Sequence, residues 1–88
     1  MKDLHPLHIL IIEDSKMVSK VLTDGFVKLG YTCDQAQSLE EAREKLVSNR
    51  YDLVTLDIHL PDGLGTDLLE EFDVFSNNGT QVAIYTAD

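Results

Sequence analysis

The stretch of residues 53–63 constrains the fold of this chain more than any other. It is an apolar run of Leu, Val and Ile that delivers one carboxylate, Asp57, to the start of a loop closed by Pro61 and an Asp-Gly pair. Such a run, stopped by turn residues, is typical of a strand covered on both faces. Because burying an unpaired carboxylate costs roughly several kcal/mol, we expect Asp57 at the solvent-facing mouth of the strand.

Three further segments have strand character, and three segments between them have helix character. The additional predicted strands are residues 7–12, 31–36 and 81–85. Apolar residues recur at helical spacing after a capping Ser15, after the capping pair Ser38 and Glu41, and again over residues 64–75. The second strand is the most polar of the four, so we expect it at a sheet edge.

The order strand, helix, strand, helix, strand, helix, strand predicts an α/β fold with a doubly wound parallel sheet. The carboxyl ends of the strands share one edge of such a sheet, and α/β proteins bind ligands there. Glu13 and Asp14 end the first strand, Asp57 ends the third, and Thr86 follows the fourth. These residues are therefore the candidate functional site.

Carboxylates gathered at one edge repel each other, and a hard divalent cation such as Mg²⁺ makes the arrangement favourable. Asp57 could then attack a phosphoryl group as a nucleophile, while the cation neutralises charge on the transferred oxygens. The Thr86 hydroxyl could donate to the product. The same residues leave open a small Mg²⁺-dependent phosphohydrolase, but His59 stands where such an enzyme would carry a second Asp as general acid.

Composition favours one small domain, residues 1–88, without a nucleic-acid or membrane partner. The formal net charge of -9 disfavours direct binding to phosphates or anionic lipids. A lone Cys33, no signal-peptide pattern and no membrane-length apolar segment lead us to expect a cytoplasmic protein. His5, His8 and His59 lack metal-site spacing on a helix, so we expect no metal binding through histidine side chains.

Three motifs together resemble the receiver domain of two-component response regulators. They are ILIIEDS at residues 9–15, LDIHLPDGLG at residues 56–65 and AIYTA at residues 83–87. Their order and spacing match the family over essentially the whole chain. The resemblance implies a flavodoxin-like fold of receiver type and a role in signal transduction, with self-catalysed phosphotransfer at most and no separate enzyme activity.

The resemblance also implies roles for individual residues. Asp57 would accept a phosphoryl group from the phosphohistidine of a sensor histidine kinase or a histidine phosphotransfer protein in a phosphorelay. Thr86 matches the hydroxyl residue that moves to hydrogen-bond the phosphoryl group, and Pro61 and Gly65 match the turn that shapes the loop after the acceptor. The implied Mg²⁺ ligands are Glu13, Asp14, Asp57 and the backbone carbonyl of His59.

The sequence departs from the family pattern at its end. The family continues with a helix, a strand ending in a lysine and a last helix, whereas this chain stops at Asp88, and none of its seven Lys and Arg residues takes that lysine's place. We therefore expect four strands and three helices, a bare fourth strand and an uncovered first helix, which favour a homodimer or segment exchange. The alternative function is a truncated, non-phosphorylatable receiver that acts as a protein-interaction or dimerisation module.

Overall fold

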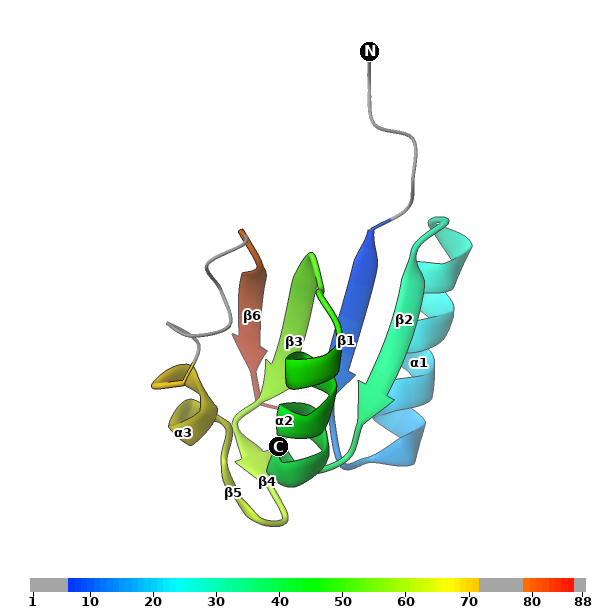
Figure 1. The fold of residues 1–88 in the computed structure, drawn as a ribbon. Coiled ribbons are helices and arrows are strands. Elements are labelled where there is room, and N and C mark those ends of the chain that lie inside the picture. The colour runs from blue at the N-terminus through cyan, green and yellow to red at the C-terminus, as the bar shows by residue number, and fades with distance from the viewer. Residues whose placement is uncertain (1–6, 72–78, 87–88) are drawn as a thin grey trace.

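The computed structural model describes residues 7–71 and 79–86. Four parallel strands form its main sheet in the order β2-β1-β3-β6 (Figure 1). This order and direction confirm the predicted doubly wound sheet. The elements follow one another as β1 (His8–Ile12), α1 (Lys16–Lys28), β2 (Thr32–Ala36), α2 (Leu39–Ser48), β3 (Leu53–Asp57), β4 (His59–Leu60), β5 (Gly63–Leu64), α3 (Gly65–Leu69) and β6 (Gln81–Tyr85).

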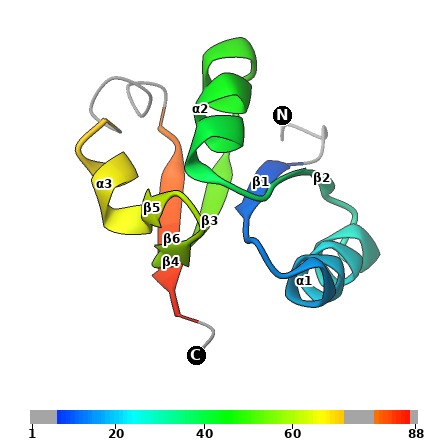
Figure 2. The ribbon, with the colours of Figure 1, turned by 90° about the horizontal axis from the view of Figure 1, so that it is seen from below.

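Helices cover both faces of the sheet. Figure 2 shows α1 on one face and α2 with α3 on the other. This two-sided covering explains why β1 and β3 are almost continuously apolar. The face under α2 holds the main apolar cluster, made of Leu10, Ile12, Ala36, Leu39, Ala42, Leu46, Tyr51, Val54, Leu56, Leu60 and Leu68. Its burial stabilises the fold by roughly 25 cal/mol per Å² of apolar surface removed from water.

The first two helices begin at the predicted capping residues. Ser15 Oγ accepts a hydrogen bond from the backbone N–H of Val18 at 3.2 Å, and Ser38 Oγ accepts one from that of Glu41 at 3.1 Å. Both bonds satisfy donors that the start of a helix leaves unpaired. The caps therefore fix where the chain turns from each strand end into the following helix.

The structure differs from the sequence prediction after β3. Strands β4 and β5 pair antiparallel there, across a turn at Pro61 and Asp62, whereas the sequence predicts a plain loop. Two-residue strands are too short to produce a recognisable pattern. The third helix is described over Gly65–Leu69, and the rest of its predicted length, with Phe72 and Phe75, lies outside the described residues.

Strands β2 and β6 are the edges of the described sheet. The edge position of β2 confirms the prediction made from its polar sequence. On the other side, β6 is paired with β3, and Ala83 and Ile84 in it are exposed. Helix α1 also leaves large apolar side chains exposed, namely Met17, Val21 and Val27. The spacing of apolar residues in α1 thus indicates a helix but overstates how much of it packs on the sheet.

Two expectations about the chain as a whole stay predictions. One is that residues 1–88 form a single receiver-like domain, incomplete at its C-terminal end. The other is the cytoplasmic location. Among the described helices, none combines the length and the apolar character needed to cross a membrane.

Candidate functional site

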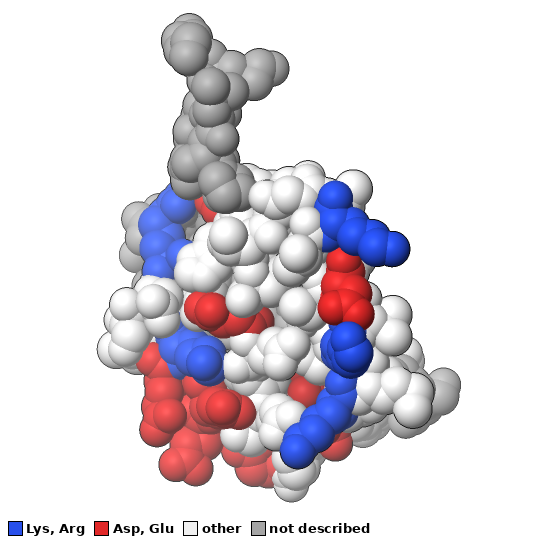
Figure 3. Space-filling model, turned by 90° about the vertical axis from the view of Figure 1, so that its right-hand side faces the viewer, with Lys and Arg blue, Asp and Glu red and all other residues white. Residues whose placement is uncertain are grey.

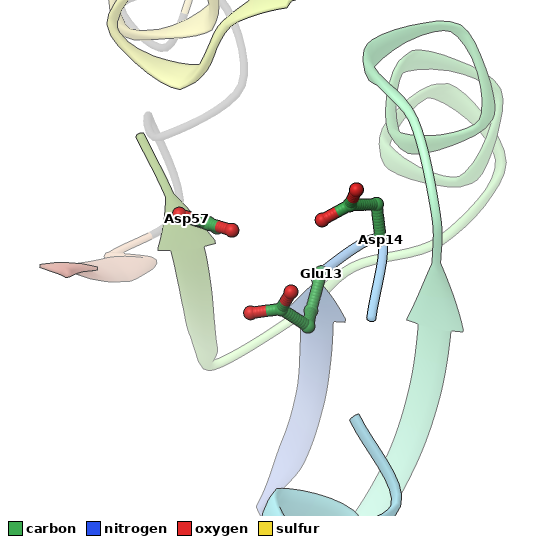
Figure 4. A group of neighbouring side chains, drawn as sticks. All are labelled: Glu13, Asp14 and Asp57. Carbon is green, nitrogen blue, oxygen red and sulfur yellow. The ribbon is translucent and has the colours of Figure 1, made fainter. Parts of the chain in front are cut away.

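Three carboxylates meet at the carboxyl edge of the sheet (Figure 4). Glu13 and Asp14 directly follow β1, and Asp57 is the last residue of β3. One oxygen from each carboxylate lies within 4.8 Å of the other two, and Figure 4 shows the groups turned toward one another. The structure therefore brings together the three acidic residues that the sequence places at this edge. We refer to them as the acidic cluster.

Strand pairing accounts for this meeting point. Ile12 pairs with Leu56 across β1 and β3, so Glu13 and Asp57 stand next to each other one position further on. Side chains alternate between the two faces of a strand. Because Ile12 and Leu56 belong to the apolar cluster under α2, the two carboxylates lie on the opposite face, the one that α1 covers.

Asp57 is buried, with 4% of its surface exposed, which corrects the expected solvent-facing position. Glu13 is 1% exposed, and only Asp14 is exposed to solvent. The backbone N–H of His59 donates to Asp57 Oδ1 at 3.2 Å, and this bond offsets part of the cost of burial. This N–H by itself does not balance a buried carboxylate with two others beside it. The site therefore carries excess negative charge.

The donor set of the acidic cluster suits a hard divalent cation. All three side chains offer carboxylate oxygens, which are the ligands that Mg²⁺ and Ca²⁺ prefer. A cation among them would relieve the repulsion between two buried negative charges. The ion pairs found among the described residues involve other carboxylates, those of Asp24, Asp34, Asp52 and Glu71. The residues that would hold a cation are thus Glu13, Asp14 and Asp57.

A tyrosine that the sequence reasoning left out of the site also reaches the acidic cluster. The hydroxyl of Tyr85, the last residue of β6, donates to Glu13 Oε1 at 2.6 Å. Burial, this hydrogen bond and the negative charges of the cluster raise the pKa of Tyr85 well above its ordinary value, so the hydroxyl stays a donor at neutral pH. The available signal is strand register, because Tyr85 pairs with Asp57 and so shares its face.

The remaining predicted site residues lie at the same edge. Thr86 directly follows β6 and is exposed. His59 is placed beside Asp57 by its backbone N–H, while its carbonyl stays a predicted ligand. The roles proposed for both residues remain predictions.

The loop after Asp57 packs tightly against the end of β3. The backbone N–H of Gly65 donates to the carbonyl of Ile58 at 2.6 Å. A Cβ atom on Gly65 would overlap the carbonyl oxygen of Asp57 and crowd the side chain of Leu56. This position therefore requires glycine because of the close approach of the backbone.

The same loop is fastened to the start of α2 by Asp62. Its carboxylate accepts hydrogen bonds from the backbone N–H groups of Leu39 at 2.8 Å and Glu40 at 3.1 Å. The bond from Leu39, followed by that from Glu40, holds the pKa of Asp62 below its usual range. Asp62 lies in the expected turn, and it also caps a helix that the sequence gives no reason to connect with it.

Acidic side chains on the surface are also concentrated toward the carboxyl end of the sheet (Figure 3). Figure 3 shows acidic side chains gathered mostly toward the lower end of the molecule, the end at which the strands finish in Figure 1. Lys and Arg side chains lie along both the left and the right side of that view. Helix α1 carries three of the lysines, and one of them, Lys20, pairs with Asp24 at 3.0 Å. The carboxyl end of the sheet is thus the more acidic end on this face.

A doubly wound sheet with clustered carboxylates at its carboxyl edge defines a class of small α/β domains with an acidic site. Within that class, the family model of the response regulator receiver domain matches residues 9–88, and the chain belongs to this family. It is similar to the transcriptional regulatory protein CusR of Escherichia coli strain K12, with 32% identity over 81 residues, 92% of this chain and 35% of CusR. The chain thus spans about a third of that relative's length.

Solved structures agree with the family assignment. A structure of the MaeR response regulator bound to beryllium trifluoride is similar, with a TM-score of 0.83 and 32% identity over 93% of this chain and 68% of that one. A structure of the histidine kinase ThkA in complex with the response regulator protein TrrA gives a TM-score of 0.82 and 31% identity, over 92% of this chain and 69% of that one. The fold of the described residues is therefore the receiver fold.

Proposed function

We propose that this chain is the phosphoacceptor domain of a phosphorelay. In this role Asp57 takes a phosphoryl group from the phosphohistidine of a sensor histidine kinase or a histidine phosphotransfer protein. The observation that carries the proposal is a buried Asp57 with carboxylate oxygens of Glu13 and Asp14 within 4.8 Å. Membership of the receiver family and the similarity to a structure that contains a kinase and a response regulator support it.

The proposed transfer is a displacement at phosphorus. A carboxylate oxygen of Asp57 attacks, the phosphorus–nitrogen bond of the donor breaks, and an acyl phosphate forms on Asp57. The histidine nitrogen leaves with the electron pair and later takes up a proton. When bound, Mg²⁺ would supply positive charge to the transferred oxygens. Its proposed ligands are Glu13, Asp14, Asp57 and the backbone carbonyl of His59.

The chain contributes orientation and water exclusion to this step. The N–H of His59 holds Oδ1 of Asp57, which limits rotation of the carboxylate and leaves Oδ2 for other contacts. Burial of Asp57 keeps water from competing with it. We assign to Thr86 the hydroxyl that hydrogen-bonds the phosphoryl oxygens, because it follows the strand residue that pairs with Asp57.

Transfer to the chain's own side chain is stoichiometric, so we propose a signalling domain and not a turnover enzyme. A phosphohydrolase would release many phosphate molecules per chain. His59 occupies the position where such an enzyme would need a second carboxylic acid. Catalytic phosphate release would therefore contradict this part of the proposal.

The test is to incubate the chain with Mg²⁺ and acetyl phosphate and to measure its intact mass. We expect one added phosphoryl group on the wild type and none on Asp57→Asn. Asp24→Asn, which changes an exposed carboxylate on α1, is the matched control and should be phosphorylated like the wild type. Binding of beryllofluoride, followed by fluorine NMR, should show the same pattern. A wild type that gains no phosphoryl group and binds no beryllofluoride would contradict the proposal.

A second candidate function is an unphosphorylated module for protein interaction or dimerisation. One observation favours it: β6 borders the described sheet and has exposed residues, and Met17 and Val21 of α1 are 77% and 65% exposed. An open strand edge and exposed apolar groups promote association, either as a homodimer or by segment exchange. Sedimentation of a well-folded monomer at tens of micromolar would contradict this candidate.

A further inference from the structure

Tyr85 holds a position that the proposed function does not explain. Its hydroxyl donates to Glu13 Oε1 at 2.6 Å, so the contact runs from β6 to the end of β1, with β3 between them in the sheet. Tyr85 pairs with Asp57 in the strand register. To reach Glu13 at the end of β1, the phenol has to cross the end of β3, where Asp57 lies. The side chain therefore lies over the acidic cluster.

The contact has the character of a strong hydrogen bond. A separation of 2.6 Å is in the range of charge-assisted O–H···O⁻ bonds. Glu13 is 1% exposed, so water does not compete for it. Its other oxygen, Oε2, accepts a hydrogen bond from the backbone N–H of Ser15 at 3.0 Å. Both oxygens of this carboxylate thus already have a donor.

We propose that the Tyr85 hydroxyl competes with a divalent cation for the Glu13 carboxylate. Without a cation, the hydroxyl offsets part of the negative charge that Glu13 and Asp57 place side by side. Cation binding at Glu13 weakens that hydrogen bond, so Tyr85 lowers the affinity of the site. Tyr85 is in this sense a positioning residue that acts through Glu13. The inference rests on the proposed function, because it concerns the same cation site.

Tyr85 also connects this competition to the acceptor. Its backbone carbonyl accepts a hydrogen bond from the N–H of Ile58 at 2.9 Å, directly after Asp57. The next residue along the chain is Thr86, the proposed partner of the phosphoryl group. Tyr85 thus contacts Glu13 through its hydroxyl and holds the backbone next to Asp57 through its carbonyl.

The experiment compares Mg²⁺ binding to the wild type, Tyr85→Phe and Tyr51→Phe by isothermal titration calorimetry. Tyr51 is the matched control, because its hydroxyl donates to Asp34 Oδ2 at 2.7 Å, away from the acidic cluster. We expect Tyr85→Phe to bind Mg²⁺ about tenfold to a hundredfold more tightly, since a hydrogen bond to a charged group is lost from the metal-free state only. Tyr51→Phe should keep the wild-type affinity. Both variants should melt at a lower temperature without Mg²⁺.

A second measurement uses the unsubstituted chain and so does not depend on the folding of a variant. Mg²⁺ should shift the ring signals of Tyr85 in carbon–proton NMR spectra and leave those of Tyr51 in place. Unchanged or weaker Mg²⁺ binding in Tyr85→Phe, or ring signals of Tyr85 that do not respond, would overturn the inference. Wild-type binding that is lost in Asp57→Asn would still support the proposed function. If neither the wild type nor Tyr85→Phe binds Mg²⁺, both proposals fail.

Discussion

The two ends of the parallel sheet each combine carboxylates with a tyrosine hydroxyl, yet they balance negative charge differently. Toward the amino end, Asp34 accepts a hydrogen bond from Tyr51 at 2.7 Å and lies 3.1 Å from His8 Nε2. The rings of His8 and Tyr51 are in contact, with centroids 4.5 Å apart. At the carboxyl end, the hydroxyl of Tyr85 reaches Glu13 in a cluster of three carboxylates.

Each of the two acids near the amino end, Asp34 and Asp52, has two partners. Asp52 accepts a hydrogen bond from the N–H of His8 at 2.8 Å and pairs with Arg50 at 3.3 Å. Carboxylates that are paired in this way support the fold. Buried carboxylates that share too few donors cost stability and mark functional sites. Under the proposed function, the difference teaches that the amino end serves the fold, while the carboxyl end gives up stability in order to bind a cation and a phosphoryl group.

The largest effect that separates the two ends should come from Mg²⁺. At about one hundred times its dissociation constant, Mg²⁺ should raise the free energy of unfolding by about 2.7 kcal/mol, and a chelator should reverse this. Asp57→Asn should abolish the gain, whereas Asp34→Asn should keep it. Thermal denaturation with Mg²⁺ and with chelator measures both. An equal loss in the two variants would remove the distinction between the ends.

Backbone packing at the carboxyl end should give the next effect. Gly65→Ala should destabilise the chain by about 1–3 kcal/mol, because its Cβ has no room beside the Asp57 carbonyl. Gly25→Ala is the control, since a Cβ there meets nothing within 4 Å in helix α1. Urea denaturation should show that variant equal to the wild type or more stable by about 0.5 kcal/mol. Similar losses in both variants would contradict the account of Gly65.

Removing one hydrogen bond at the amino end should have a smaller effect. Tyr51→Phe should lower the free energy of unfolding by about 1 kcal/mol, because Asp34 loses a donor. Urea denaturation at neutral pH measures the change. A stability equal to that of the wild type would show that the bond between Tyr51 and Asp34 does not support the fold.

The smallest effect concerns Asp62, a carboxylate at the acidic end that does have partners. Hydrogen bonds from Leu39 and Glu40 hold its pKa below the ordinary range, so ionised Asp62 stabilises the start of α2 at neutral pH. That contribution should be lost as the pH falls below about 4 and through the lowered pKa of the folded state. Amide exchange of Leu39 and Glu40 should be faster in Asp62→Ala than in the wild type at pH 6.

At low pH the amide exchange rates of Leu39 and Glu40 in the wild type should become similar to those in Asp62→Ala, because wild-type Asp62 then loses its charge. A difference between them that does not depend on pH would show that the carboxylate charge is not what caps α2. This result would weaken the conclusion from the two ends of the sheet. That conclusion is that the hydrogen-bond and charge partners of a carboxylate, and not its position in the fold, decide whether it stabilises the fold.

Local patterns in the sequence predicted much of the fold. Apolar runs ended by turn residues located the four long strands, and the polar sequence of β2 placed it at an edge. Ser15 and Ser38 marked the starts of two helices. The acidic cluster was predictable as well, because the carboxyl ends of parallel strands always share one edge.

Contacts between distant residues were beyond the reach of the sequence. The hydrogen bond from Tyr85 to Glu13 joins residues 72 positions apart and depends on strand register and side-chain direction. The prediction that Asp57 faces solvent was wrong. It was based on the cost of removing a carboxylate from water, whereas the fold encloses the site with Tyr85 and the loop that follows Asp57. Asp62 caps a helix that ends before β3 begins, a contact that no local pattern reveals.

The most direct test of the central claim is the unfolding free energy of the wild type, Asp57→Asn and Asp34→Asn in urea with chelator present. If the carboxyl end holds uncompensated charge, Asp57→Asn should be more stable than the wild type by about 1–3 kcal/mol. Asp34→Asn should be less stable by about 1 kcal/mol, because a compensated carboxylate is lost. An Asp57→Asn variant that is less stable than the wild type without Mg²⁺ would contradict the account.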